Sequence, residues 1–132
     1  PKVAFLSFAT NGSAQHESLD KIRRAASLTV LKVAAEGLDI IVDGEIQADA
    51  ALVPSIAAKK YPDSALKGEA NVLIFPDLNS ANISYKLVQR LANIPVYGPL
   101  LQGLAKPVND LSRGCSAEDI YGVAAITACQ VT

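Results

Sequence analysis

The chain has little of several residue types that would point to a specialised class of protein. It contains no Trp and no Met, its aromatic residues make up only 5% of the sequence, and there is one His among 132 residues. Its 12 basic and 13 acidic side chains give a formal net charge of -1, which creates no long-range field to attract nucleic acid or an anionic membrane. We therefore expect neither a nucleic-acid partner nor a membrane partner.

Long apolar runs and cysteine patterns are also missing. No run reaches bilayer length, and the start at Pro1 lacks the basic, apolar and small-residue sections of a signal peptide, so we expect a cytoplasmic protein. The two cysteines, Cys115 and Cys129, have no second pair and no His nearby, so the sequence indicates neither a zinc site nor a disulfide framework. We expect both thiols to be reduced.

The residues that are abundant indicate an α/β fold. Half of the chain is hydrophobic and 19% is charged, which is typical of an ordinary globular domain. Buried-strand patterns at 3–8, 38–43 and 71–76 alternate with helical patterns at 16–36, 48–60 and 80–91. Gly37 is a stop signal for the first helix, and Gly44 is expected to break the second strand. This order predicts a three-layer structure with a mostly parallel sheet, right-handed crossovers and helices on both faces.

The pattern changes near residue 101. After a short apolar run at 95–101, residues 102–116 lack periodicity and are predicted to form a structured loop. A final helix is predicted at 117–131, and the surface on which it packs is expected to lie outside this chain.

The end of this loop carries the strongest chemical signal. Ser112 and Arg113 come just before a helix N-terminus, where unpaired N–H groups, the helix dipole and a guanidinium favour a phosphate. A structural alternative competes, because Ser116 is a good N-cap and Asp119 occupies the partner position of a capping box. From the residues alone, capping is favoured by about two to one.

Other polar residues give weaker signals. His16 has no evident partners for a base or a metal site, and we expect it to be an exposed first-turn residue. Asp43, Glu45 and Asp49 follow the second strand, where nothing fixes an octahedral oxygen set, and they are expected to be solvated loop or cap residues. Cys115 has no His or Lys beside it to lower its pKa, so it is not expected to act as a nucleophile.

Several collinear stretches resemble motifs of the phosphate acetyltransferase family. They are residues 42–51 (VDGEIQADAA), 71–78 (NVLIFPDL), 82–86 (NISYK), 98–104 (GPLLQGL) and 106–114 (KPVNDLSRG). The resemblance implies an isocitrate/isopropylmalate dehydrogenase-like fold and the interconversion of acetyl-CoA and phosphate with CoA and acetyl phosphate. It implies these small molecules as substrates, with no metal or prosthetic group.

The resemblance also implies roles for three residues. Asp119 matches the family's aspartate that acts as a base toward the CoA thiol. Ser112 matches a serine that donates a hydrogen bond to the developing charge on the acetyl group, and Arg113 matches an arginine that contacts phosphate. A carboxylate that deprotonates a thiol needs a raised pKa, so we expect Asp119 to be partly buried in an assembled cleft. Retention of all three argues against the first alternative, a non-catalytic regulatory or oligomerisation domain. A phosphate butyryltransferase is the second alternative, because the acyl pocket cannot be identified in the sequence.

Catalytic domains of the family are much longer than this chain and carry further phosphate-binding arginines. The resemblance thus implies a C-terminal fragment that is inactive in isolation. Residues 1–101 are expected to form part of a second α/β domain, and residues 102–132 to form the active-site loop and a helix that returns to a mostly missing first domain. The exposed sheet edge and orphaned helix favour dimerisation, and we expect a homodimer.

Overall fold

The computed structural model describes residues 1–131, so Thr132, the last residue of the predicted segment 102–132, lies outside it. The chain divides into two compact units. Unit 1 comprises Pro1–Ala81, and unit 2 begins at Asn82. Among the described residues, no helix combines the length and the apolar character needed to cross a membrane.

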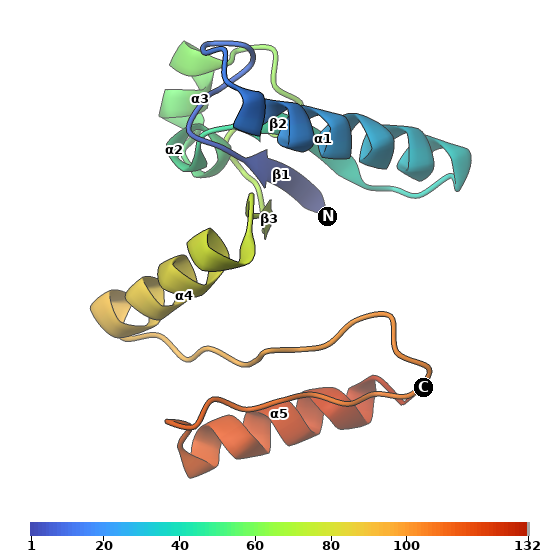
Figure 1. Ribbon diagram of the computed structural model, residues 1–132, viewed down its shortest axis with the longest axis vertical. Helices are drawn as coiled ribbons and strands as arrows, with labels where there is room; N and C mark the ends of the chain where they lie inside the picture. Colours follow the sequence, from blue (N-terminus) through green and yellow to red (C-terminus); the bar gives the residue numbers. More distant parts are fainter. Residues whose placement is uncertain (132) are drawn as a thin grey trace. The chain divides into compact units, whose positions relative to one another are not determined.

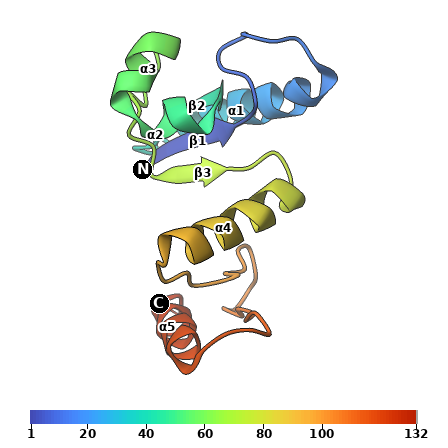
Figure 2. The same cartoon turned by 90° about the vertical axis from the view of Figure 1, so that its left-hand side faces the viewer.

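Unit 1 is built on a three-stranded parallel sheet, which confirms the predicted strand pairing. The strands are β1 (Lys2–Leu6), β2 (Ile41–Ile46) and β3 (Val72–Ile74), in the order β2-β1-β3. Both neighbours of β1 run parallel to it, and the arrows of β1 and β3 point the same way in Figure 2. The carboxyl ends of the strands consequently lie at one edge of the sheet.

Helices cover both faces of this sheet. Successive side chains of β1 point to opposite faces, so Phe5 packs with Ile22 and Ala26 of α1 (Glu17–Ala35). Ala4 and Leu6 pack on the other face with buried alanines of α2 (Ala48–Leu52). Figure 1 shows α1 alongside the sheet, with α2 and α3 (Pro54–Lys60) grouped at its other side. Within unit 1 the predicted three-layer arrangement is confirmed.

The long helix α1 begins and ends close to the predicted bounds because its signals are local. His16 is the exposed N-cap, one position before the first turn, and its ring Nδ1 accepts the Ser18 N–H at 3.2 Å. At the other end Gly37 has φ +63°, and the N–H groups of Gly37 and Leu38 donate to Ala34 and Val33. This is the Schellman arrangement that glycine favours after a helix.

The predicted bounds of the second strand, residues 38–43, were wrong. Strand β2 begins at Ile41 rather than at residue 38, and it continues through Gly44 to Ile46. Gly44 pairs with Phe5 of β1, so it lies inside the ladder instead of ending it. Pairing with a neighbouring strand decided the position, and the local glycine signal did not.

The single helix predicted at 48–60 was also wrong, because the structure has two. Val53 ends α2 with extended backbone, and Pro54 starts α3 at its first turn. Proline has no backbone N–H and suits the first position of a helix, which explains the break. Helix α3 then ends at Lys60, as predicted.

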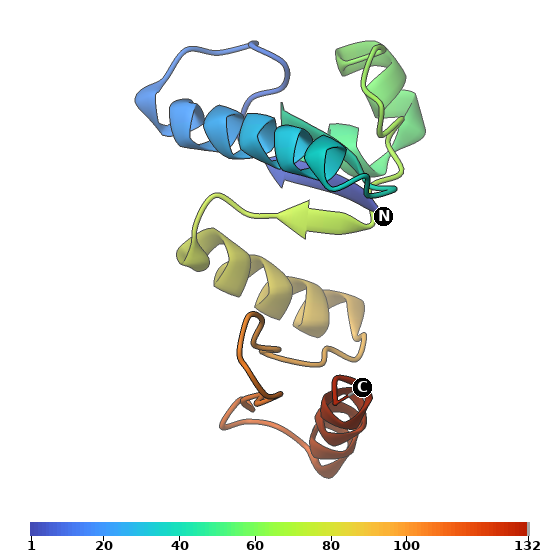
Figure 3. The same cartoon turned by 90° about the vertical axis from the view of Figure 1, so that its right-hand side faces the viewer.

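Unit 2 contains most of α4 (Leu78–Ala92) and all of α5 (Ala117–Cys129), joined by a long irregular segment that Figure 3 shows. Both predicted helices are confirmed within two residues at each end. Asn109 ties the segment to α5, because its side-chain amide donates to Thr127 and Gln130 at 2.8 and 2.7 Å. Its Oδ1 accepts the Leu101 N–H at 2.8 Å. These bonds fix the base of the loop that carries Ser112.

Candidate active site

The loop before α5 ends in a complete capping box. The Ser116 Oγ accepts the Asp119 N–H at 3.2 Å, and Asp119 Oδ2 accepts the Ser116 N–H at 2.8 Å. The Ser116 hydroxyl also donates to the same carboxylate oxygen at 2.9 Å. The capping alternative that the sequence left open is therefore present, and it anchors Asp119 on the first turn of α5.

This anchoring affects the charge state of Asp119. The Ser116 N–H and then the Ser116 hydroxyl, with a smaller contribution from the charge of Arg90, hold the pKa of the Asp119 carboxyl below its usual value. That direction is opposite to the raised pKa that we expected for a base toward a thiol. Asp119 is ionised at neutral pH, and among the described residues its Oδ1 accepts no hydrogen bond.

Ser112 and Arg113 lie in the turn just before the cap. The Ser112 carbonyl accepts the Cys115 N–H at 3.0 Å, and its hydroxyl oxygen lies 3.3 Å from the Gly114 nitrogen, which donates to it. Arg113 is exposed, and it makes no ion pair within residues 1–131. The turn thus presents one hydroxyl and one exposed guanidinium beside the helix start.

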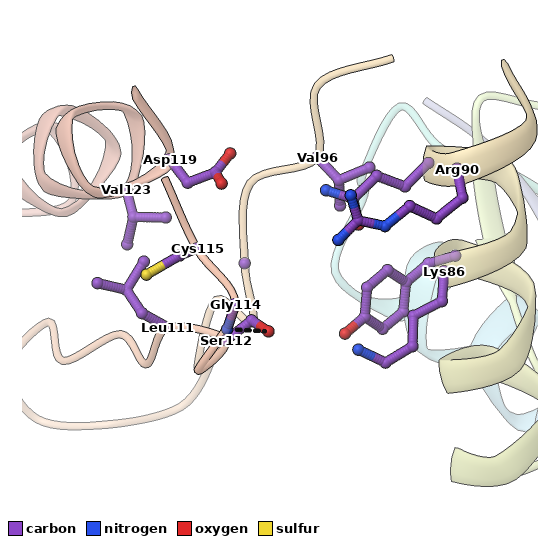
Figure 4. A pocket seen from close by; sticks show the side chains of 12 residues that line it. Lys86, Arg90, Val96, Leu111, Ser112, Gly114, Cys115, Asp119 and Val123 are labelled. Carbon is purple, nitrogen blue, oxygen red and sulfur yellow. Dashed lines mark hydrogen bonds between the residues drawn. The ribbon is translucent and has the colours of Figure 1, made fainter. Parts of the chain in front are cut away.

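A hollow of about 250 Å³ within unit 2 brings Ser112 and Asp119 to one place. Figure 4 shows both on the loop and α5 side, with Cys115 and Val123, while Lys86 and Arg90 extend from α4. Arg113 is not among the lining residues. Two of the three predicted site residues, Ser112 and Asp119, therefore line one hollow. Lys86 and Arg90 were not predicted as site residues. Their spacing of four residues on a predicted helix places them on one face, and this was the signal that could have identified them.

The carboxylates that were expected to follow the second strand differ from that expectation, because Asp43 and Glu45 lie within β2. Glu45 is buried inside unit 1 and is not a solvated loop residue, because Arg23 of α1 donates to both of its carboxylate oxygens, at 2.5 and 2.8 Å. Asp43 is also held inside the unit, accepting the Ser64 hydroxyl at 2.7 Å. Asp49 is half-exposed and pairs with Lys60. No group of three or more His, Cys, Asp or Glu residues in positions 1–131 could hold a metal ion.

Comparison with known proteins adds the family. The family described as phosphate acetyl/butaryl transferase matches residues 1–128. A phosphate acetyltransferase of Staphylococcus aureus is 53% identical over 130 residues, covering 98% of this chain and 40% of its own length. One of Acetivibrio thermocellus is 56% identical over 130 residues, covering 98% of this chain and 38% of its own.

Solved structures agree with the sequence relatives. The EutD phosphotransacetylase from Staphylococcus aureus superposes with a TM-score of 0.93 at 52% identity, covering 100% of this chain and 40% of its own. A phosphotransacetylase from Streptococcus pyogenes superposes with a TM-score of 0.87 at 54% identity, and the match covers 99% of this chain and 39% of that structure's chain. The chain thus spans about two fifths of the length of the relatives that it matches, and it belongs to the phosphate acetyl/butaryl transferase family.

Proposed function

We propose that this chain supplies part of the active site of a phosphate acetyltransferase, which converts acetyl-CoA and phosphate to CoA and acetyl phosphate and the reverse. The observation that carries the proposal is that Ser112 and Asp119 line one hollow in a chain 53% identical to a phosphate acetyltransferase. The substrates are CoA, acetyl phosphate and inorganic phosphate.

The proposed chemistry assigns each residue a step. A thiol attacks as its thiolate, so the Asp119 carboxylate takes the proton from the CoA sulfur. The sulfur then bonds to the carbonyl carbon of acetyl phosphate, and the Ser112 hydroxyl donates to the oxyanion of the tetrahedral species. Collapse of that species breaks the bond from carbon to the bridging oxygen and releases phosphate, which Arg113 contacts. Because Asp119 has a lowered pKa, it is a weak base whose advantage is its placement.

The remaining expectations stay predictions. They are the assignment of residues 1–101 to a second domain and of residues 102–132 to a loop and helix returning to a first domain, the homodimer, the cytoplasmic location, and chemistry without a metal or prosthetic group. The length of the relatives supports the first of these, since each is about two and a half times as long as the matched chain.

The test is the rate of acetyl-CoA formation from acetyl phosphate and CoA. It is measured on the 132-residue chain and on a chimera in which this chain replaces the matching segment of the Staphylococcus aureus enzyme. We expect no turnover by the chain alone and turnover by the chimera, because the chain provides only one wall of the site. Butyryl phosphate is assayed in parallel and is expected to react more slowly.

A folded chimera without activity, beside an active parent enzyme, would contradict the proposal and favour a non-catalytic domain. Faster reaction with butyryl phosphate would replace acetyl by butyryl as the transferred group. Turnover by the chain alone would show that the missing length is not needed for catalysis.

A further inference from the structure

Two basic side chains of α4 face the hollow that contains Ser112 and Asp119. Lys86 and Arg90 are one helical turn apart, so they lie on the same side of α4. In Figure 4 both side chains extend from α4 toward the side of the hollow formed by the loop and α5, with Arg90 nearer the level of Asp119 and the Lys86 nitrogen nearer the level of Ser112. Neither the sequence motifs nor the proposed chemistry gives these two side chains a role.

Within the described part of the chain neither cation makes an ion pair, although the charge of Arg90 contributes to the lowered pKa of Asp119. Among residues 1–131 neither makes an ion pair within 4.0 Å, and the one close contact of the Lys86 ammonium is with the Tyr85 ring, at 4.9 Å from its centroid. Like charges four residues apart repel each other on a helix. An anion held between the two side chains would replace this repulsion by two attractions.

The charge and the size of the hollow favour a small anion. Its lining carries two cations against one carboxylate, Asp119. Its volume of about 250 Å³ is below the roughly 300–1,000 Å³ of pockets that enclose a drug-sized ligand. Within this unit it therefore has room for a single phosphate group.

We propose that Lys86 and Arg90 form the subsite for the phosphate group of the acyl phosphate, with Arg90 as the main ligand. The identity of this anion rests on the proposed function. The planar guanidinium of Arg90 holds two phosphate oxygens side by side, and Lys86 adds a point charge one turn away. Arg113 does not line the hollow, so its proposed contact with the released phosphate is made from the turn beside this subsite and adds to it.

A purely structural role for Arg90 has a different consequence. Arg90 lies in the last turn of α4, where a positive charge stabilises the helix dipole. Loss of that role would lower the helix stability without changing the affinity for phosphate, so the test measures both quantities.

The first experiment titrates inorganic phosphate into the 132-residue chain, followed by calorimetry, with helix content checked by circular dichroism. We expect Arg90→Ala to weaken phosphate binding at least tenfold, Lys86→Ala to weaken it less, and Arg90→Lys to restore only part of the loss. Arg24→Ala is the matched control, because Arg24 is also an exposed helical arginine without an ion pair among the described residues, and it is not among the residues that line the hollow of unit 2. It is expected to bind like the unchanged chain.

The second experiment separates the phosphate of the acyl phosphate from those of CoA. In the chimera, Arg90→Ala is expected to raise the KM for phosphate at least tenfold and to leave the KM for CoA within twofold. A raised KM for CoA alone, equal phosphate affinity in Arg90→Ala and the unchanged chain, or no phosphate binding by a folded chain would each overturn the proposal. Phosphate binding that depends on Arg90 in a chimera without acyl transfer would sustain the anion site and overturn the proposed function alone.

Discussion

Glu45 joins three parts of unit 1 through one side chain. It lies in β2 with 4% of its surface exposed, receives two hydrogen bonds from Arg23 of α1, and accepts the Gly12 N–H at 2.9 Å. The Arg23 guanidinium, followed by the Gly12 N–H, holds the pKa of Glu45 below its usual value, although burial opposes this. The carboxylate therefore stabilises the fold in its ionised form.

Glu45→Gln is expected to lower the free energy of unfolding at pH 7 by about 2 kcal/mol, because charge-assisted hydrogen bonds are lost within the fold. The folded pKa is depressed, so this contribution is full above the unfolded pKa of about 4.3 and declines as the pH falls through the folded pKa. Urea unfolding at pH 7 and at pH 3 should thus show a difference between variant and unchanged chain that shrinks in acid.

Glu69→Gln is the control for this experiment, since Glu69 pairs with Lys2 at the surface and is 59% exposed. We expect little change at either pH. An equal loss of unfolding free energy in both variants would mean that the burial of Glu45 does not strengthen its ion pair with Arg23.

At the scale of residues, the sequence predicted side-chain contacts correctly where the partners are close in the chain. Ser116 and Asp119 are three positions apart, and their capping box was visible in the spacing. The partners Arg23 and Glu45 are 22 positions apart, and only the packing of α1 on the sheet brings them together. No pattern in the chain indicates that contact, which is why Glu45 was assigned to a solvated loop.

At the scale of elements, the turn before β3 fits closely against the break between α2 and α3. Gly68 has φ +74°, and a Cβ placed on it would lie 2.6 Å from backbone atoms of Val53 and Pro54. Because those atoms are backbone, they have little freedom to move away.

Gly68→Ala is expected to lower the free energy of unfolding by about 2 kcal/mol or more, through the left-handed backbone and the collision together. Gly12→Ala is the matched control, because Gly12 has φ +79° and open space where its Cβ would be. It is expected to cost about 1 kcal/mol, from the backbone conformation alone. Thermal unfolding that shows equal losses at the two positions would contradict the close fit.

Elements were predictable where short-range signals determine them. The ends of α1 follow from His16 and Gly37, which act within a few residues. The position of β2 depends on its pairing with β1, for example between Lys2 and Ile41, which are 39 residues apart in the sequence. Its bounds were therefore predicted incorrectly. The break at Pro54 was visible in the sequence, but the apolar spacing across it was given more weight.

At the scale of the whole chain, the two units differ in their buried cores. Unit 1 holds two clusters of buried apolar residues, one on each face of the sheet. Among residues 82–131, Val123 is the one buried hydrophobic side chain, and Leu91 and Tyr121 are 82% and 74% exposed. Local stability follows buried apolar contact.

We expect hydrogen exchange of the isolated chain to be slow in β1, β2 and the middle of α1 and at least about tenfold faster in α4 and α5. Exchange measured by mass spectrometry at peptide resolution checks this directly. Equal protection of α5 and β1 from hydrogen exchange would contradict this expectation, because it would require α5 to be more deeply buried than it is in this structure.

In the proposed function, Asp119 acts in catalysis and not only as a helix cap, and this role is central. The most direct measurement is the kcat of the chimera for acetyl-CoA formation, compared between the variants Asp119→Asn and Ser116→Ala. Ser116→Ala removes the hydroxyl part of the cap but leaves the Ser116 N–H on Asp119, so it is expected to cost about 1 kcal/mol of stability while kcat falls much less than in Asp119→Asn. Asp119→Asn preserves shape and removes the base, so kcat should fall by about 10²–10⁴-fold. Retained kcat in Asp119→Asn, or equal losses in the two variants, would contradict the account.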